Sequence, residues 1–141
     1  MGEYVAVTEY SLPIVPRFAE IDQQNVVFNA HYLTWFDEAL TGYFDHLDAS
    51  YPDLMSVGLD MQLVHSEIDY AAPVRWRDAV RVAVVCEQVG TTSFTIGFSV
   101  LRQRDDSAEI LAVAGRNVYV VVSTDDWTKR PVPEKLRKVL S

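Results

Sequence analysis

Residues 17–33 read RFAEIDQQNVVFNAHYL, and this stretch decides how the rest of the chain can be arranged. A strand-like start runs into a polar turn with one aspartate, Asp22, and the turn leads into residues with helical spacing. Asn29 is predicted to cap that helix, because an asparagine side chain accepts hydrogen bonds from the first helical N–H groups. A carboxylate beside the exposed N–H groups of a helix start can attack a carbonyl and stabilise the oxyanion that forms.

The residues after this turn predict a long amphipathic helix from 30 to about 47. Apolar side chains recur at spacings of three and four, and polar side chains fill the other face. Gly42 interrupts this pattern at a cost of ~1 kcal/mol relative to alanine, so close packing is its expected reason. The apolar positions are Leu33, Phe36, Leu40, Tyr43 or Phe44, and Leu47.

Strand patterns lie on both sides of the predicted helix. Residues 12–19 are predicted to form a strand whose two prolines favour an edge position, after an irregular lead-in over residues 1–11. Four runs rich in β-branched and aromatic residues follow Gly58, and the short breaks between them predict antiparallel hairpins. These runs are 61–72, 79–89, 93–104 and 109–123, with one short helical turn expected within 48–58 and a terminal helix over 134–140.

The element order predicts a single α+β domain over residues 1–141, with a curved antiparallel sheet of about five strands wrapped around one long central helix. The last run, 109–123, is long enough to form an exposed edge on which a second subunit could continue the sheet.

Composition and charge narrow the function. The chain has 141 residues, is 49% hydrophobic and carries a net charge of −8, which argues against nucleic acid or anionic membrane as the main partner. No apolar run is long enough to span a bilayer. The single cysteine, Cys86, lies in an apolar strand pattern and is expected to be buried. With no signal-peptide pattern at the N-terminus, the lone cysteine predicts a cytoplasmic protein.

Four motifs, in this order, resemble the hotdog-fold acyl-CoA thioesterases of the 4-hydroxybenzoyl-CoA thioesterase-like branch. They are DQQNVVFNAHY at 22–32, IDYAAPVRWRD at 68–78, GTTS at 90–93 and WTKRPVP at 127–133. The resemblance covers the chain from about residue 15 to residue 140. It implies a hotdog fold, a homodimer or homotetramer with active sites at the subunit interface, and hydrolysis of an acyl-CoA thioester.

The resemblance also assigns roles by position. Asp22 would be the catalytic base or nucleophile, and a backbone N–H near Phe28 or Asn29 would polarise the thioester carbonyl. CoA is then part of the substrate, and no cofactor is implied. The three histidines are too scattered to form a metal site. Substrate contacts are expected from Phe28, His31, Tyr32, Arg77 and Ser93.

Two departures from the family pattern affect this site. The family often has glycine where this chain has Asn25, and asparagine tolerates a left-handed backbone better than most residues. The benzoyl-CoA member carries basic residues for the nucleotide phosphates where this chain has the uncharged stretch at 90–92. Arg77 is a candidate substitute.

Each assignment has a structural alternative. Asp22 could form only an Asx-turn, and Asn29 could serve only as a cap. Glu20 is expected to be solvated or paired. Glu38 is the main rival carboxylate, because other hotdog branches place theirs on the central helix, although its spacing favours a solvated face.

Two further functions stay open. One is a thioesterase acting on acyl groups held by an acyl carrier protein, which the net negative charge disfavours unless a local basic patch exists. The other is a non-catalytic acyl-CoA-binding module.

Overall fold

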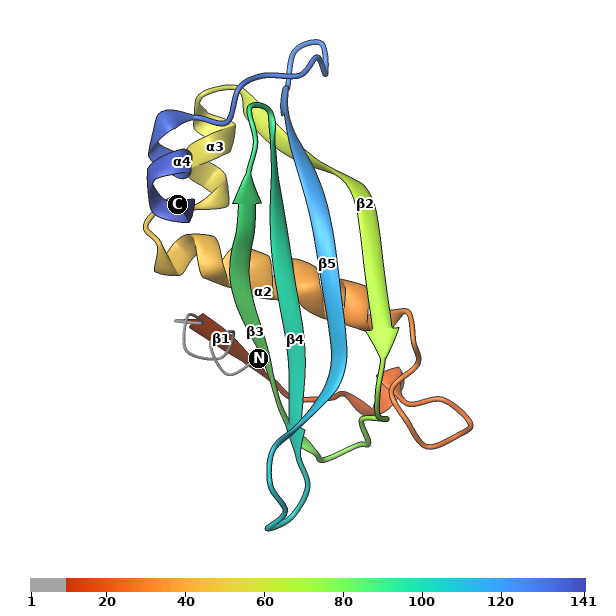
Figure 1. The fold of residues 1–141 in the computed structure, drawn as a ribbon. Coiled ribbons are helices and arrows are strands. Elements are labelled where there is room, and N and C mark those ends of the chain that lie inside the picture. Colours follow the sequence, from red (N-terminus) through yellow and green to blue (C-terminus); the bar gives the residue numbers. More distant parts are fainter. Residues whose placement is uncertain (1–9) are drawn as a thin grey trace.

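The computed structural model describes residues 10–141, which form a five-stranded antiparallel sheet with one long helix packed against it (Figure 1). Most of the irregular lead-in predicted over residues 1–11 lies outside the described residues. In chain order the elements are β1 (Tyr10–Ile14), the 3₁₀ helix η1 (Phe18–Glu20), α2 (His31–His46), α3 (Tyr51–Ser56), β2 (Leu59–Tyr70), β3 (Ala79–Val89), β4 (Ser93–Gln103), β5 (Ile110–Ser123) and α4 (Glu134–Leu140).

The strands lie in the order β1-β3-β4-β5-β2. The predicted hairpins are confirmed for β3 with β4 and for β4 with β5. The prediction is wrong for β2 and β3, because β2 pairs with β5 instead. It is also wrong that β5 is an edge strand, since β5 lies between β4 and β2. A short connection therefore does not ensure a hairpin, and β4 and β5 lie between β3 and β2 in the sheet.

The first strand is at an edge, as its prolines predict, but it is shorter than expected and ends at Ile14. The residues from Arg17 to Glu20 turn into η1 instead of continuing the strand. The reason is the Glu20 carboxylate, which accepts the Arg17 backbone N–H at 2.8 Å and the Trp35 indole N–H at 3.1 Å. These bonds fold the chain back toward α2.

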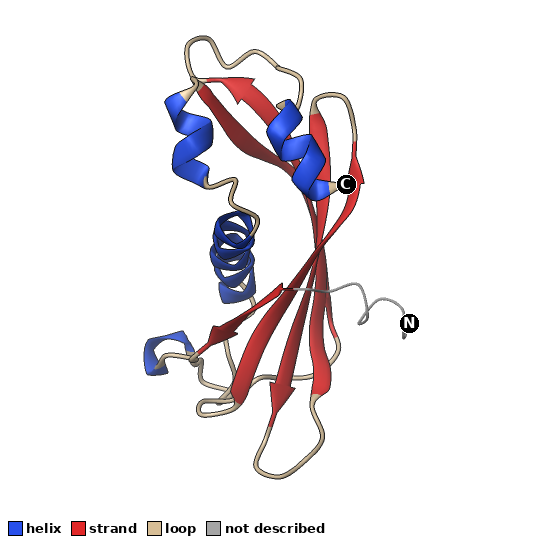
Figure 2. Cartoon of the chain, turned by 90° about the vertical axis from the view of Figure 1, so that its left-hand side faces the viewer, coloured by secondary structure: helices blue, strands red, loops and turns tan. Residues whose placement is uncertain are grey.

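The helix α2 lies along one face of the sheet, which curves around it (Figure 2). Phe36 stacks on Phe98 of β4 with ring centroids 4.5 Å apart. Leu33 is 38% exposed although its spacing predicts burial, because the core face of the helix is centred one residue earlier. That face consists of Tyr32, Trp35, Phe36, Ala39, Leu40 and Phe44.

Two glycines allow close packing around α2. A Cβ at Gly42 would collide with the hydroxyl of Tyr10 on β1, which confirms the predicted reason for this glycine. A Cβ at Gly115 of β5 would collide with the fully buried Phe36 ring. The helix can therefore approach both β1 and the centre of the sheet.

Cys86 is half-buried at the end of the core rather than fully buried as expected, because it lies near the end of β3. Burial raises the pKa of its thiol, and its sulfur lies 3.6 Å from the carbonyl oxygen of Gln88. This thiol is therefore mainly protonated near neutral pH. Between residues 10 and 141, no helix has the length and apolar character that a bilayer crossing requires.

Candidate active site

Asp22 lies in a tight turn between two residues that pair with each other, Ile21 and Val27. The Asp22 N–H donates to the Val26 carbonyl at 2.9 Å, and the Asn25 N–H donates to the Asp22 carbonyl at 3.0 Å. Asn25 has a φ of +66°, which confirms that this position needs the left-handed backbone. Backbone hydrogen bonds thus close the turn.

The Asp22 carboxylate is half-buried, and its Oδ1 accepts the Gln24 backbone N–H at 2.7 Å. This is the Asx-turn that the sequence allows as a structural role. Its Oδ2 accepts no hydrogen bond from any residue within 10–141. One oxygen therefore fixes the carboxylate, and the other is available to a ligand.

The start of α2 differs from the prediction. Its N-cap is Ala30, with φ −75° and ψ −20°, and Asn29 does not cap the helix with its side chain. The reason is a preceding turn, in which the His31 N–H donates to the Phe28 carbonyl at 3.0 Å. A backbone acceptor therefore does what the predicted side-chain cap would have done.

Two N–H groups near this helix start are candidate donors to a substrate carbonyl. The Phe28 N–H already donates to the Glu20 carbonyl at 2.9 Å. The Asn29 N–H has no acceptor in the described part of the chain. Of the two donors, only the Asn29 N–H is available.

Tyr70, at the end of β2, binds the backbone of Asn29. Its hydroxyl donates to the Asn29 carbonyl oxygen at 3.0 Å. Sequence reasoning missed this residue, since its pattern reads only as the end of a strand. The signal that could have found it is its place in the motif at 68–78.

A cavity of about 290 Å³ brings these groups together. Tyr32 forms part of its wall and is 3% exposed, and burial raises the pKa of Tyr32 to about 12, so its hydroxyl stays neutral. The Val27 N–H donates to the Val74 carbonyl at 2.8 Å and joins the turn to the loop 71–78. The lining residues are Asp22, Gln24, Val26, Val27, Asn29, Tyr32, Tyr70, Ala71, Ala72 and Pro73.

The other predicted substrate contacts lie outside this cavity. Phe28 and His31 contact each other, with ring centroids 5.9 Å apart, and neither lines it. Arg77 lies on the loop that supplies Pro73. Ser93 pairs with Val120 of β5, whereas Tyr70 pairs with Val113 of the same strand. Seven residues of strand separate those two registers, roughly 23 Å at 3.3 Å per residue, so one chain does not bring Ser93 to Asp22.

The two alternative carboxylates, Glu20 and Glu38, lie outside the cavity that contains Asp22. Glu20 is 4% exposed and paired rather than solvated. Burial alone would raise its pKa, but hydrogen bonds from Arg17 and Trp35 hold the pKa of Glu20 below its ordinary value. Glu38 is exposed, as its spacing predicts, and both carboxylates line a separate cavity of about 280 Å³ beside β1. Neither shares a cavity with Asp22.

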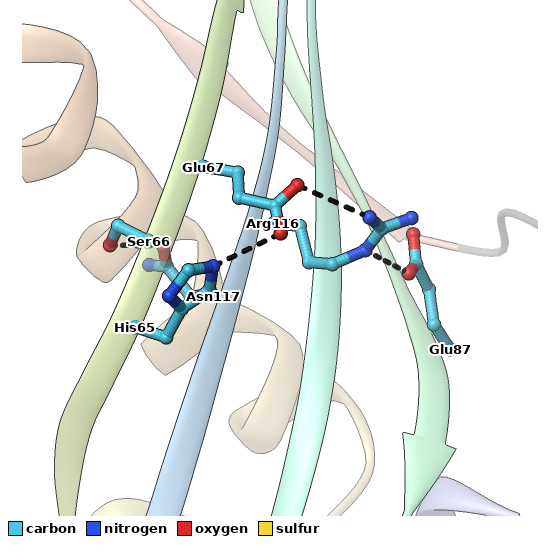
Figure 3. A network of polar contacts seen from close by, with 6 residues as sticks. All are labelled: His65, Ser66, Glu67, Glu87, Arg116 and Asn117. Atoms are coloured by element: carbon cyan, nitrogen blue, oxygen red, sulfur yellow. Dashed lines mark hydrogen bonds and ion pairs between the residues drawn. The ribbon is translucent and has the colours of Figure 1, made fainter.

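The sheet face opposite to α2 carries an ion-pair network (Figure 3). Arg116 of β5 contacts Glu87 of β3 at 2.6 Å and Glu67 of β2 at 3.4 Å, and His65 lies 3.0 Å from Glu67. The network ties the edge strand β2 to the inner strands. Residues 10–141 contain no group of three histidine, cysteine or acidic side chains arranged to hold a metal ion.

Comparisons with known proteins relate the chain to one family and one fold. A family model described as "Thioesterase superfamily" matches residues 24–109, starting just after Asp22. The Bacillus subtilis protein named "Putative acyl-CoA thioesterase YneP" is 26% identical over 84 residues, which span 60% of this chain and 61% of that protein.

Solved structures share the architecture. A 1,4-dihydroxy-2-naphthoyl-CoA thioesterase from Synechocystis superposes with a TM-score of 0.81 at 20% identity, covering 93% of this chain and 94% of that one. A mutant of 4-hydroxybenzoyl-CoA thioesterase, solved with 4-hydroxybenzoyl-CoA, gives a TM-score of 0.84 at 16% identity, covering 94% of this chain and 98% of that one. The predicted hotdog fold is confirmed.

Proposed function

Because the chain belongs to the thioesterase superfamily, as its motifs predict, we propose that it hydrolyses an acyl-CoA thioester to a free acid and CoA. The observation that carries this proposal is the shared cavity. Within it, the Asp22 carboxylate keeps one oxygen free and the Asn29 N–H keeps its hydrogen free. These are the two groups that cleavage of a thioester requires.

Asp22 can act by either of two routes. Its free oxygen can attack the carbonyl carbon, expel the CoA thiolate and leave a mixed anhydride that water cleaves. Alternatively, Asp22 takes a proton from a water molecule that attacks the same carbon. In both routes, negative charge develops on the carbonyl oxygen, where the Asn29 N–H would stabilise it. Thiolate is a good leaving group, so neither route needs a metal or a cofactor.

The proposal is tested by measuring free-thiol release from short, long and aromatic acyl-CoAs. We expect Asp22→Asn to lower kcat by about 10²- to 10⁴-fold, the usual contribution of a positioned acid or base. Glu38→Gln is the matched control, because it neutralises the rival carboxylate, and it should retain wild-type turnover.

Full activity in Asp22→Asn would refute the role of Asp22. A loss confined to Glu38→Gln would move the reaction to the cavity beside β1. If the wild type binds acyl-CoAs but releases no thiol, the chain is a binding module. If it cleaves only carrier-linked acyl groups, the substrate is an acyl carrier protein.

The proposed enzyme is a cytoplasmic homo-oligomer whose subunits meet along β2, not along β5 as first expected. β2 lies at an open edge of the sheet. It exposes two large apolar side chains there, Leu63 at 47% and Val64 at 58%. An unpaired edge with apolar side chains favours pairing with a second copy. The cytoplasmic setting rests on the lone Cys86, which has no disulfide partner in its own chain.

A further inference from the structure

Two large aromatic side chains are exposed next to each other beside the candidate active site. Phe18 of η1 is 71% exposed and Trp76 of the loop 71–78 is 44% exposed. Their rings meet edge to face with centroids 5.2 Å apart. A contiguous exposed apolar patch is characteristic of a binding site, whereas a single exposed ring is not. Because two separate segments position them side by side, they form a platform for another flat group.

Arg77 extends this platform. Its guanidinium carbon lies 4.3 Å from the centroid of the Trp76 ring, a cation–π contact. The backbone of Arg77 has a φ of +76°, a conformation that is costly for any residue with a side chain. The loop thus presents an exposed tryptophan together with Arg77, whose planar guanidinium can itself stack on a base.

Three arginines at this loop form no ion pair with a carboxylate of the described residues. Of the nine arginines in the sequence, five pair with a carboxylate. Within residues 10–141 the other four form no such ion pair. Two of them, Arg75 and Arg77, belong to this loop. A third, Arg102 of β4, donates to the Pro73 carbonyl at 3.0 Å and helps to lower the pKa of Asp78. In a chain with a net charge of −8 and twenty acidic residues, such a group favours an anion from outside.

The loop borders the cavity that contains Asp22. Pro73 lines that cavity, and Trp76 follows three residues later, within about 10 Å along the backbone. We propose that the Phe18–Trp76–Arg77 platform stacks the adenine of the acyl-CoA, while Arg75, Arg77 and Arg102 bind its phosphates. This inference rests on the proposed function and names a subsite for the nucleotide end of that substrate.

The aromatic rings favour a nucleotide over an acidic carrier protein. Both ligands are anionic and both present a phosphopantetheine arm, so the arginines alone do not separate them. Only CoA carries a purine base, and base stacking on aromatic side chains contributes strongly to binding. The phosphates of CoA lie between its base and its thioester, and Arg102 donates to Pro73, a residue that lines the cavity.

The kinetic test compares acyl-CoA with the matching acyl-pantetheine, which has the same thioester and no nucleotide. We expect Trp76→Ala to lower kcat/KM for acyl-CoA about tenfold, mainly through KM, and to leave acyl-pantetheine turnover unchanged. Trp76→Phe should retain most of the activity. Trp127→Ala is the matched control, since Trp127 is also an exposed tryptophan, at 60%, and lies in the loop before α4.

The arginines are tested with Arg77→Ala against Lys138→Ala, which removes the same charge from an exposed position on α4. Arg77→Ala should weaken acyl-CoA turnover about tenfold and reduce its salt dependence, whereas Lys138→Ala should do neither. Equal losses with acyl-CoA and acyl-pantetheine would overturn the subsite. So would a preference for carrier-linked substrate that Trp76→Ala leaves intact.

Calorimetry with CoA itself separates this inference from the proposed function. Suppose that wild type cleaves no thioester yet binds CoA, and that Trp76→Ala weakens that binding about tenfold. The proposed hydrolysis is then refuted and the proposed nucleotide subsite is supported. If wild type cleaves acyl-CoA and Trp76→Ala binds CoA as tightly as Trp127→Ala does, the subsite is wrong and the reaction holds.

Discussion

The side chain of Asp22 depends on one neighbouring residue for its direction. Asn25 takes the left-handed backbone, so the chain can return to Val26 and leave one carboxylate oxygen free toward the cavity. Asparagine is among the few residues that adopt this conformation at low cost. The left-handed backbone at Asn25 could therefore be predicted from the sequence alone. The hydrogen bond from Tyr70 to the Asn29 carbonyl could not be predicted in this way.

That partner, Tyr70, provides a prediction for a positioning residue. Tyr70→Phe removes the hydroxyl that holds the Asn29 carbonyl, so the neighbouring N–H loses its fixed place. We expect kcat to fall by up to roughly a hundredfold, the effect of a displacement of about 1 Å, with KM little changed. Tyr51→Phe is the control, since Tyr51 donates to Asp60 away from the cavity. Unchanged kcat in Tyr70→Phe would show that Asn29 needs no such support.

Among the elements, the contact between α2 and β5 depends on Gly115, which has no side chain. Gly115→Ala would place a methyl group against the buried Phe36 ring, and overpacking of this kind costs about 1–3 kcal/mol. Urea denaturation should show that loss. Gly97→Ala is the control, because its new methyl group meets the exposed Glu87 side chain and not a buried ring, and it disturbs at most the surface ion pair of Glu87 with Arg116. Equal stability of the two variants would mean that the Phe36 ring can move aside.

The sequence predicts those elements whose bounds depend on neighbouring residues, and it misses those that depend on contacts with distant residues. Spacing places α2 within a residue of each end, and a run of β-branched residues between two breaks finds β3 with both ends correct. The end of β1 is missed, because Glu20 closes η1 through Trp35, fifteen residues away. The place of β2 is missed for the same reason, since its partner β5 lies far along the chain. In the candidate site, the turn at Asp22 can be predicted from the sequence. The hydrogen bond from Tyr70 to Asn29 cannot, because the two residues lie far apart in the chain.

For the whole molecule, acid should destabilise the fold through Glu20. Its pKa is held below the unfolded value near 4.5, so its contribution is complete above that pH and is lost as the pH falls through the folded pKa. Glu20→Gln should lower the free energy of unfolding by about 1–2 kcal/mol at pH 7. The difference from wild type should be smaller at pH 3 than at pH 7, because lowering the pH below 4.5 moves Glu20 toward its neutral form. Urea titrations at both pH values test this, with the exposed Glu38→Gln expected to match wild type throughout.

The assembly of the molecule gives a second prediction at this scale. If subunits pair along β2, wild type should sediment as a dimer or a tetramer. Val64→Lys should sediment as a smaller species, because a charge on an open edge opposes strand pairing. Lys138→Ala on α4 should leave the mass unchanged. A wild type that sediments as a monomer at micromolar concentration would refute the proposed interface.

The pairing of β2 with β5 also has a consequence for the newborn chain. The partner of β2 is the last strand to be synthesised, since β2 ends at Tyr70 and β5 ends at Ser123, 53 residues later. At 5–20 residues per second, the ribosome needs about 3–10 s to make them. Until then α2 has no complete sheet to cover its apolar face, which makes the nascent chain a natural client for chaperones. A chain truncated within β5 should therefore fail to fold as a whole.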